Sequence, residues 1–354
     1  MVASALETFS FNEMKKVAVV ILNYNGRKFL EQFLPNLIAN CDPQMSEVVV
    51  ADNASTDDSV AFMQEHYPEI RLILNGSNGG FATGYNVALR QIEAKYYVLL
   101  NSDIEVAPRW IEPVIELMDA DPMIAACQPK ILSYYHREQF EYAGACGGFI
   151  DKYGYPFCRG RVFQNLENDE GQYDTPVEVF WATGACMFVR AELYHQLGGL
   201  DDSFFAHMEE IDLCWRLKNA GYKVYCCPQS KVYHIGGGTL PKNSSRKTYL
   251  NFRNNLSLLV KNLPEGKVVP IIAYRIVLDW VAAMKFLCEG CFADFRMVFK
   301  AHFDFYGRMK SLKEKRKVVK HEKVSCMYMR NIVFDSILGG KKKYSDLDSR
   351  SFRK

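Results

Sequence analysis

Short apolar runs alternate with amphipathic segments along the first hundred residues of the chain. Residues 17–22 are fully apolar and rich in β-branched side chains, which is typical of a buried parallel strand. Residues 27–40 then carry apolar side chains at helical spacing, and residues 47–51 form a second buried run. The unit repeats, with further strands expected at 71–74 and 96–100 and helices between them. This alternation predicts an α/β fold, a Rossmann-like and mostly parallel sheet flanked by helices.

The pattern loosens beyond residue 104. Residues 104–177 are rich in glycine and tyrosine and are interpreted as excursions from the sheet, and regular apolar structure returns at 177–189. Residues 268–306 are apolar but interrupted by charged side chains, which favours amphipathic helices over a bilayer span. We therefore expect four parts: an N-terminal extension (1–16), an α/β domain (17–264), an amphipathic helical extension (265–307) and a basic tail (308–354).

Composition and charge narrow the class of protein. The 354 residues are 49% hydrophobic and 24% charged, as expected of a globular chain with a large core. The net charge of +2 argues against a nucleic-acid partner, but it hides an asymmetry, because residues 308–354 alone carry +10. The scattered cysteines favour reduced thiols, and the N-terminus lacks the pattern of a secretory signal. No uncharged apolar run approaches the roughly 18 to 20 residues that span a bilayer, so we expect a cytoplasmic protein.

Polar side chains gather where the predicted strands end. They are Asn23 and Asn25, Asp52, and Asn101, Ser102 and Asp103. Ligands of parallel α/β sheets bind outside the carboxyl ends of the strands. There Asp52 could accept the imide N–H of a uracil or thymine, and Asp103 could bind a hard divalent cation together with a diphosphate. An aspartate after a strand is, taken alone, more often a turn or helix cap.

The usual phosphate-binding loops are missing from these strand ends. No GxxxxGK[ST] motif occurs and no GxGxxG follows the first strand, which disfavours the common nucleoside triphosphate and dinucleotide folds. Gly79 and Gly80 would still let backbone pass close to a ligand.

Two further motifs carry acid–base chemistry. Glu209, Glu210 and Asp212 crowd three carboxylates into four residues, which raises pKa values and suits a general base, although a solvated first helical turn is the plain alternative. For Asp212 we favour an ion pair with Arg216, one helical turn further on. His234 stands before a run of three glycines, at a turn rather than on an apolar face.

Seven ordered motifs resemble glycosyltransferase family 2, the inverting GT-A transferases, and within it the bacterial rhamnosyltransferase-like branch. The resemblance covers about residues 17–264. The motifs are VAVVILNYNG, VVVADNASTDDS, NGSNGGFATGYNVA, YYVLLNSD, WATGACMFVRAELYHQLGGLDDSFF, EEIDLCWRLKNAGYKV and VYHIGGGT.

The resemblance implies a role for each matching residue. Nucleotide binding falls to Asn23, Asn25, Asp52, Gly79, Asn86, Asn101 and Ser102. Asp103 is the implied metal ligand of the family's Asp-x-Asp motif, and His234 completes the site with Mg²⁺ or Mn²⁺ left open. Glu210 stands at the family's catalytic Asp, and Glu209 remains a second candidate base.

Three further residues are weaker candidates for contact with the ligands, and a purely structural role is the alternative. Trp181 would offer a flat face to a sugar or else belong to the core, and Asp212 is a candidate on the acceptor side. Arg253 would touch phosphate or else form an ion pair on a helix surface.

The implied reaction moves a sugar from a UDP- or dTDP-sugar to a hydroxyl of a glycan or lipid-linked acceptor in bacterial surface polysaccharide synthesis, with inversion. A sugar nucleotidyltransferase and a non-catalytic nucleotide-sugar-binding scaffold are the competing classes. The helical extension and basic tail suggest peripheral contact with the anionic inner face of the cytoplasmic membrane. The alternative is a solvated tail together with helices that pack on the domain or on a second subunit in a homodimer.

Overall fold

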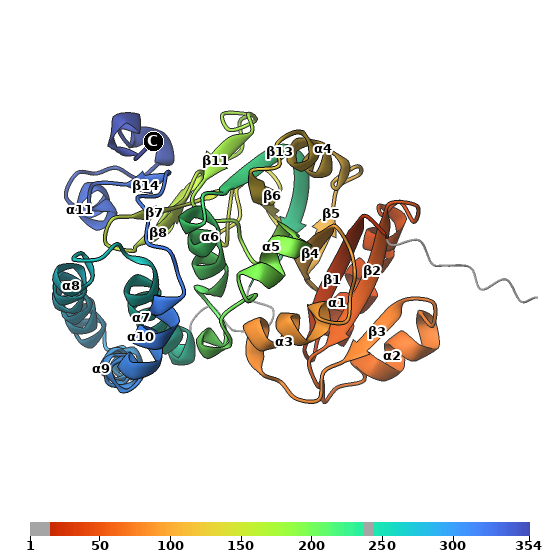
Figure 1. Ribbon diagram of the computed structural model, residues 1–354, viewed down its shortest axis with the longest axis horizontal. Helices are drawn as coiled ribbons and strands as arrows, with labels where there is room; N and C mark the ends of the chain where they lie inside the picture. Colours follow the sequence, from red (N-terminus) through yellow and green to blue (C-terminus); the bar gives the residue numbers. More distant parts are fainter. Residues whose placement is uncertain (1–14, 237–243) are drawn as a thin grey trace, which may run out of the picture.

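A computed structural model describes residues 15–236 and 244–354 of the chain. Nearly all of the expected N-terminal extension, and the second and third glycines after His234, lie outside these ranges. The described chain contains a nine-stranded sheet, a smaller five-stranded sheet and a group of helices at the C-terminal side (Figure 1).

The N-terminal half of the large sheet has the predicted parallel order β3-β2-β1-β4. Its strands are β1 (Val17–Asn23), β2 (Ser46–Asp52), β3 (Arg71–Leu74) and β4 (Tyr96–Asn101), and its helices are α1 (Arg27–Ala39), α2 (Ser59–His66) and α3 (Gly80–Leu89). Alternate residues of β1 face opposite sides: Val19 packs with α1 and α2, and Val20 packs with α3. The sequence prediction is confirmed for these elements.

The other half of the large sheet is mixed. Strand β12 (Cys186–Arg190) runs antiparallel between β4 and β6 (Ile124–Ser133), and β13 (Lys223–His234) pairs with β6 in parallel. The remaining elements here are β5 (Ile104–Val106), β11 (Val177–Val179), α4 (Glu112–Ala120), α5 (Ala191–Gln196), the 3₁₀ helix η1 (Asp202–Phe204) and α6 (Glu209–Asn219). Because β13 and β5 pair antiparallel, His234 lies opposite Ile104, one residue after Asp103.

The five-stranded sheet falls largely in the region interpreted as excursions. It is formed by β7 (Gly148–Asp151), β8 (Pro156–Cys158), β9 (Arg161–Val162), β10 (Asn165–Leu166) and β14 (Met327–Tyr328). Strands of two to four residues carry too little periodicity for the sequence to show them. Strand β14 comes from the far C-terminus and pairs in parallel with β7.

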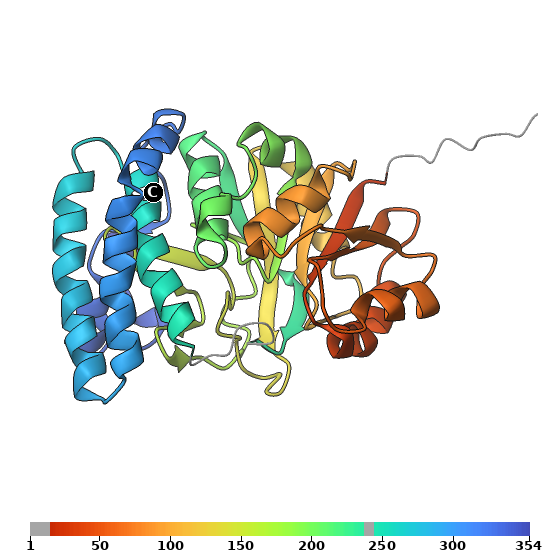
Figure 2. The same ribbon diagram turned by 90° about the horizontal axis from the view of Figure 1, so that it is seen from below.

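Helices fill the C-terminal side of the molecule, where α7, α8 and α9 lie side by side (Figure 2). They are α7 (Ser245–Asn262), α8 (Val268–Cys288), α9 (Phe292–Gly307), α10 (Met309–Lys317) and α11 (Ile332–Ile337). Helices α8 and α9 confirm the amphipathic helical extension. Among the described helices, none has both the length and the apolar character needed to cross a bilayer.

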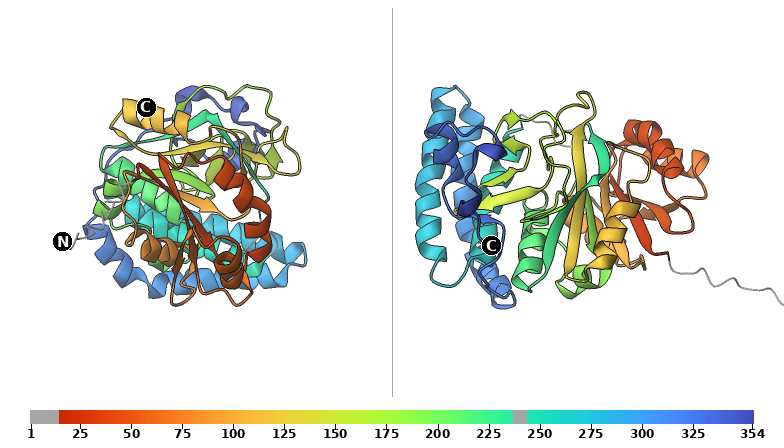
Figure 3. Two further views of the ribbon diagram at one scale, coloured as in Figure 1. Left: turned by 90° about the vertical axis from the view of Figure 1, so that its right-hand side faces the viewer. Right: turned by 90° about the horizontal axis from the view of Figure 1, so that it is seen from above.

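The segment 308–354 is folded rather than a free tail, which corrects that part of the expectation. Figure 3 shows it lying against α7, α8 and the small sheet. Its Tyr328 and Phe352 join Phe149 and Phe157 in an aromatic cluster with ring centroids 4.9 to 6.3 Å apart. The positive charges are therefore carried on a packed scaffold.

Candidate active site

The ends of β1 and β2 are joined by a buried carboxylate. Asp52 is 2% exposed, and its Oδ2 accepts hydrogen bonds from Asn23 Nδ2 at 2.9 Å and from Ser55 Oγ at 2.7 Å. Its Oδ1 accepts from the Ser55 backbone N–H at 2.8 Å. Asn23 Oδ1 is buried without a partner, and a Cβ on Gly26 would lie 2.3 Å from it. Asp52 thus shapes the loop at this edge, and its contact with a base stays a prediction.

Other predicted nucleotide-binding residues border the same edge. Asn25 is exposed in a left-handed conformation, and its Oδ1 accepts from the Thr56 backbone N–H at 2.7 Å. Asn101 and Ser102 are half-buried, and Gly79 stands half-buried at the N-terminus of α3. Register explains this grouping, because Asn23 pairs with Asp52 and Leu22 with Asn101.

His234 is held between two carboxylates. Its Nε2 lies 3.1 Å from Asp103 Oδ1, and its Nδ1 lies 3.3 Å from Glu141 Oε2. Burial alone would lower the pKa of His234, but the charges of Glu141 and Asp103 raise it to about 10. The imidazolium in turn keeps the pKa of each carboxyl below its usual value, against the opposing effect of burial.

This cluster is compatible with a divalent cation that takes the place of the proton on Nε2 of His234, since only an unprotonated ring nitrogen can bind a metal. Two ligands bound at right angles to a cation with bonds of about 2.1 Å lie roughly 3.0 Å apart, close to the Asp103–His234 separation. Glu141 sits where a carboxylate would orient the second nitrogen of a metal-binding histidine. No group of three His, Cys, Asp or Glu side chains with metal-site geometry occurs in residues 15–236 and 244–354, so water or ligand oxygens would have to complete the coordination.

At the start of α6, Glu209 is buried and Glu210 is half-buried, and burial is the main cause of the altered acidity of both carboxyls. It raises the pKa of Glu210 to about 7, and burial together with the charge of Glu210 raises the pKa of Glu209 well above its usual range. The Oε2 atoms of both residues are buried and lack hydrogen-bond partners. A carboxylate in this state can accept a proton near neutral pH.

A strained loop places this pair. Phe205, His207 and Met208 have φ angles of 67°, 69° and 76°, which non-glycine residues adopt only when the surroundings enforce them. Asn254 Nδ2 lies 2.8 to 2.9 Å from the carbonyl oxygens of Phe204, Ala206 and His207 and so binds the loop from α7. We therefore interpret Asn254 as the residue that fixes the loop before the acidic pair.

The loop and the strand ends meet through the turn before β12. The backbone N–H of Asn101 donates to the carbonyl of Ala185 at 2.9 Å, and the neighbouring Gly184 faces Glu210, where an added Cβ would lie 3.8 Å from the Glu210 Cβ. The structure thus connects the β4 end, and with it Asp103 and His234, to the Glu210 side of the site.

Two predicted residues of the nucleotide and sugar sites are placed in the interior. Asn86 is buried, donates to Leu200 O at 2.7 Å and Asp202 Oδ1 at 2.6 Å, and accepts from Tyr194 OH at 2.7 Å. Trp181 is buried with its Nε1 donating to Phe149 O, so the core alternative describes it. Both side chains hold segments of the chain together, and their contact with a ligand stays a prediction.

Arg253 is also buried, which excludes the alternative of an ion pair on a helix surface, and its contact with phosphate stays a prediction. It is 4% exposed and donates to the carbonyl oxygens of Ser203 and Phe204 at 3.2 and 3.0 Å. It lines a pocket on the far side of the 201–208 loop rather than the strand-end site.

Asp212 has no exposed surface, which removes it from the acceptor side. The predicted ion pair with Arg216 is confirmed, with Nε 2.8 Å from Asp212 Oδ2. Lys261 Nζ lies 2.9 Å from the same oxygen, and Asn262 Nδ2 donates to Oδ1 at 2.8 Å. The carboxylate is a structural joint between α6 and α7.

Sequence reasoning missed Glu141 and the loop-binding role of Asn254. Glu141 lies in the loosely patterned region, where nothing marks it as a partner of His234. Asn254 follows Arg253 in a helix whose start is separated from His234 by the glycine run, and it carries no motif of its own. Only the three-dimensional arrangement identifies both residues.

Comparison with known proteins identifies the class of this arrangement as a glycosyltransferase of the GT-A fold. The profile of "Glycosyl transferase family 2" matches residues 18–198. The chain belongs to glycosyltransferase family 2, and it is a glycosyltransferase rather than a nucleotidyltransferase or scaffold.

Named relatives agree with this class. The chain is similar to N-acetylglucosaminyl-diphospho-decaprenol L-rhamnosyltransferase of Mycobacterium tuberculosis, at 28% identity over 61% of this chain and 75% of the relative. It is similar to rhamnosyltransferase WbbL of Escherichia coli, at 25% identity over 62% of this chain and 83% of the relative.

Among solved structures, GalNAc-T7 with UDP, GalNAc and Mn²⁺ matches with a TM-score of 0.56 at 16% identity, over 72% of this chain. The chain spans about half of that protein, 49%, so the match supports the fold.

Replacing Asp212 by asparagine should destabilise the protein by about 3 kcal/mol, because Arg216 and Lys261 would be left buried without their charge partner. Burial would raise the pKa of Asp212, but the positive charges of Lys261 and Arg216 outweigh it and hold the pKa below its usual value. The wild-type stabilisation is therefore complete above about pH 4 and lost as the pH falls through the folded-state pKa. Denaturant unfolding of wild type and Asp212→Asn from pH 7 to pH 3 measures both effects. Asp58→Asn, at an exposed carboxylate, is the control, and equal losses in the two variants would contradict the assignment.

Proposed function

We propose that the protein transfers a sugar, with inversion, from a nucleotide-diphosphate donor to a hydroxyl of a glycan or lipid-linked acceptor. The observation that carries the proposal is the connection of the Asp103–His234 cluster at the strand ends to the buried carboxylate of Glu210. The names of the two rhamnosyltransferases favour a deoxyhexosyl donor such as a UDP- or dTDP-sugar, a lipid-linked acceptor and a place in surface polysaccharide synthesis.

Glu210 is the proposed base. It is half-buried with an unpartnered oxygen, whereas Glu209 is 4% exposed and has the more strongly raised pKa. The Glu210 carboxylate accepts the proton of the acceptor hydroxyl as its oxygen attacks the anomeric carbon. The bond to the diphosphate breaks in the same displacement, so the configuration of that carbon inverts.

Asp103 and His234 are the residues that would hold a divalent cation, Mg²⁺ or Mn²⁺. Such a cation supplies electrostatic stabilisation of the leaving diphosphate. Asn25, Asn101, Ser102 and the N-terminus of α3 at Gly79 border the edge where the donor would lie. The buried Asn23 and Asp52 would support that wall from behind.

We further propose that α8 and α9 rest on an anionic membrane surface. Each helix exposes large apolar side chains along one face: Val269, Val277, Trp280, Val281 and Met284 on α8, and Phe292, Phe299, Phe303 and Tyr306 on α9. Exposed cationic side chains flank these faces, among them Lys285, Arg296 and Lys300. Apolar insertion together with cationic contact is the combination by which amphipathic helices bind anionic lipid.

The donor site is tested by thermal stabilisation with a panel of nucleoside diphosphates in Mn²⁺, Mg²⁺ or chelator. Ligand binding to the native state raises Tm by mass action, so we expect a shift that depends on the base and the cation. Asp103→Ala and His234→Ala should abolish it. Asp58→Asn, outside the site, should keep it. Absence of a shift with every diphosphate would refute the donor assignment.

The base assignment is tested by Glu210→Gln and Glu209→Gln. We expect kcat to fall about 10²- to 10⁴-fold in Glu210→Gln with little change in donor Kd, because the proton acceptor is lost while the donor site is intact. The wild-type rate should rise with pH towards a plateau above about 7, since the carboxylate must be ionised. A larger loss in Glu209→Gln than in Glu210→Gln would reverse the assignment.

Membrane contact is tested by flotation with vesicles of neutral or anionic lipid. We expect binding to anionic vesicles that weakens with salt and is reduced at least about tenfold in Trp280→Glu and Phe303→Glu. Tyr135→Glu, at an exposed aromatic side chain outside these helices, is the matched control. Equal flotation of all three variants, or none by the wild type, would rule the contact out.

A further inference from the structure

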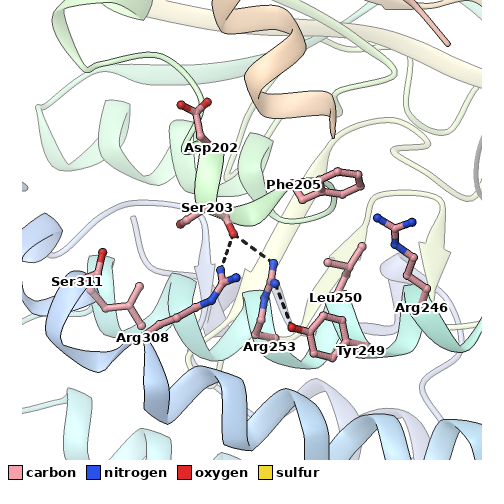
Figure 4. Close-up of a pocket in the computed structure, with 10 residues that line it drawn as sticks. Asp202, Ser203, Phe205, Arg246, Tyr249, Leu250, Arg253, Arg308 and Ser311 are labelled. Atoms are coloured by element: carbon pink, nitrogen blue, oxygen red, sulfur yellow. Dashed lines mark hydrogen bonds between the residues drawn. The ribbon is translucent and has the colours of Figure 1, made fainter. Parts of the chain in front are cut away.

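A pocket of about 510 Å³ lies between the 201–208 loop and the C-terminal helices (Figure 4). Its lining comprises Asp202, Ser203 and Phe205 from the loop, Arg246, Tyr249, Leu250 and Arg253 from α7, and Arg308, Ser311 and Leu312 from the start of α10. None of the predicted strand-end residues contributes to it. The pocket is therefore separate from the proposed donor site, and the loop between them leads to Glu210.

Three arginines give this pocket its chemistry. In the described parts of the chain, no carboxylate forms an ion pair with Arg246, Arg253 or Arg308. Asp202, the acidic residue of the lining, accepts a hydrogen bond from Asn86 and points away from the arginines in Figure 4. The pocket thus combines positive charge with room for a ligand.

Burial and mutual repulsion make the positive charge of Arg253 unfavourable in this pocket. Burial lowers the pKa of Arg253, and the nearby charge of Arg308 lowers it further, although a hydrogen bond to Tyr249 opposes both. Both guanidinium groups donate to the carbonyl oxygen of Ser203, Arg308 at 2.7 Å. A bound anion would relieve the repulsion between two cations held on one acceptor.

Helix α7 directs a continuous face at the pocket. Arg246, Tyr249, Leu250 and Arg253 are spaced i, i+3, i+4 and i+7, so they share one side of the helix. Arg246 lies in the first turn, where backbone N–H groups carry partial positive charge, and its guanidinium stacks on Phe205 at 4.7 Å from the ring centroid. The planar arginine fork suits bidentate binding of phosphate oxygens.

We propose that this pocket binds the phosphate or diphosphate group of the acceptor. The assignment rests on the proposed transfer to a lipid-linked acceptor. It follows from the pocket's separation from the strand ends, from the shared loop that carries the base, and from Arg308, which follows directly on α9 with its exposed Phe303 and Tyr306. A phosphate on a lipid carrier would meet the arginines while the carrier chain stays near the apolar helices.

The test is calorimetric titration of inorganic pyrophosphate into the full chain in chelator, which removes the cation-dependent donor site. We expect binding that weakens at least about tenfold in Arg246→Ala and in Arg308→Ala, since each removes a charge-assisted contact. Arg90→Ala, at an exposed arginine after α3 and outside the lining, should bind as the wild type does. Arg246 is exposed, so its removal leaves the fold intact, which a melting curve of each variant verifies.

Competition identifies the source of the phosphate. Geranyl diphosphate should displace pyrophosphate from wild type more strongly than UDP does in chelator, which would support an acceptor pocket. Equal or stronger displacement by UDP would make the pocket a second nucleotide site and overturn the proposal, as would unchanged pyrophosphate binding in Arg246→Ala and Arg308→Ala. The donor site is tested separately, by UDP binding that depends on the cation and is lost in Asp103→Ala. A negative result for the arginine pocket would therefore leave the donor site unaffected.

Discussion

The active-site side of the molecule depends on one buried network of opposite charges. Asp212 on α6 binds Arg216 and Lys261, and Lys261 reaches Asp201 at 2.5 Å, which also binds Lys315 of α10. Two carboxylates and their cations thereby join α6, the 201–208 loop, α7 and α10. Such a network is favourable only when each charge keeps its partners, so these four segments must adopt their positions together.

The strained 201–208 loop is held in place by this network of ion pairs. Its residues with positive φ would relax if the segment were free, but its two ends are fixed, by Asp201 on one side and α6 on the other. Asn254 holds the carbonyl groups in between. The acidic pair is thus presented by backbone that the surrounding helices enforce, and its unpartnered oxygens stay out of reach of stabilising donors.

Sequence patterns predicted the parts of this protein whose physics is local. The apolar strands 17–22 and 47–51 and the polar residues at their ends follow from periodicity and from the rule that parallel strands end at one edge. Asp212 and Arg216 could be paired because four residues separate them on a helix. The small sheet, Glu141 and the contact of Asn254 with the loop could not be predicted, because each depends on contacts between distant segments that leave no periodic trace.

Burial also changed the meaning of residues that sequence motifs single out. Asn86 and Trp181 match family motifs, yet their polar atoms are used inside the protein, and Arg253 faces a different pocket from the one expected. A sequence motif alone does not say whether a residue contacts a ligand or packs inside the protein. The structure separates these two roles.

The carbonyl group of Ser203 links the arginine pocket to the loop that carries the proposed base. It accepts hydrogen bonds from Arg253 and Arg308, and the same loop continues to Glu210. If an anion that draws these guanidinium groups towards itself changed the proton affinity of the Glu210 carboxylate through this loop, the two sites would be coupled. Thermodynamic reciprocity then requires the protonation of Glu210 to change the affinity for the anion by the same factor. Acceptor binding and proton uptake by Glu210 would in that case be linked by a single coupling free energy.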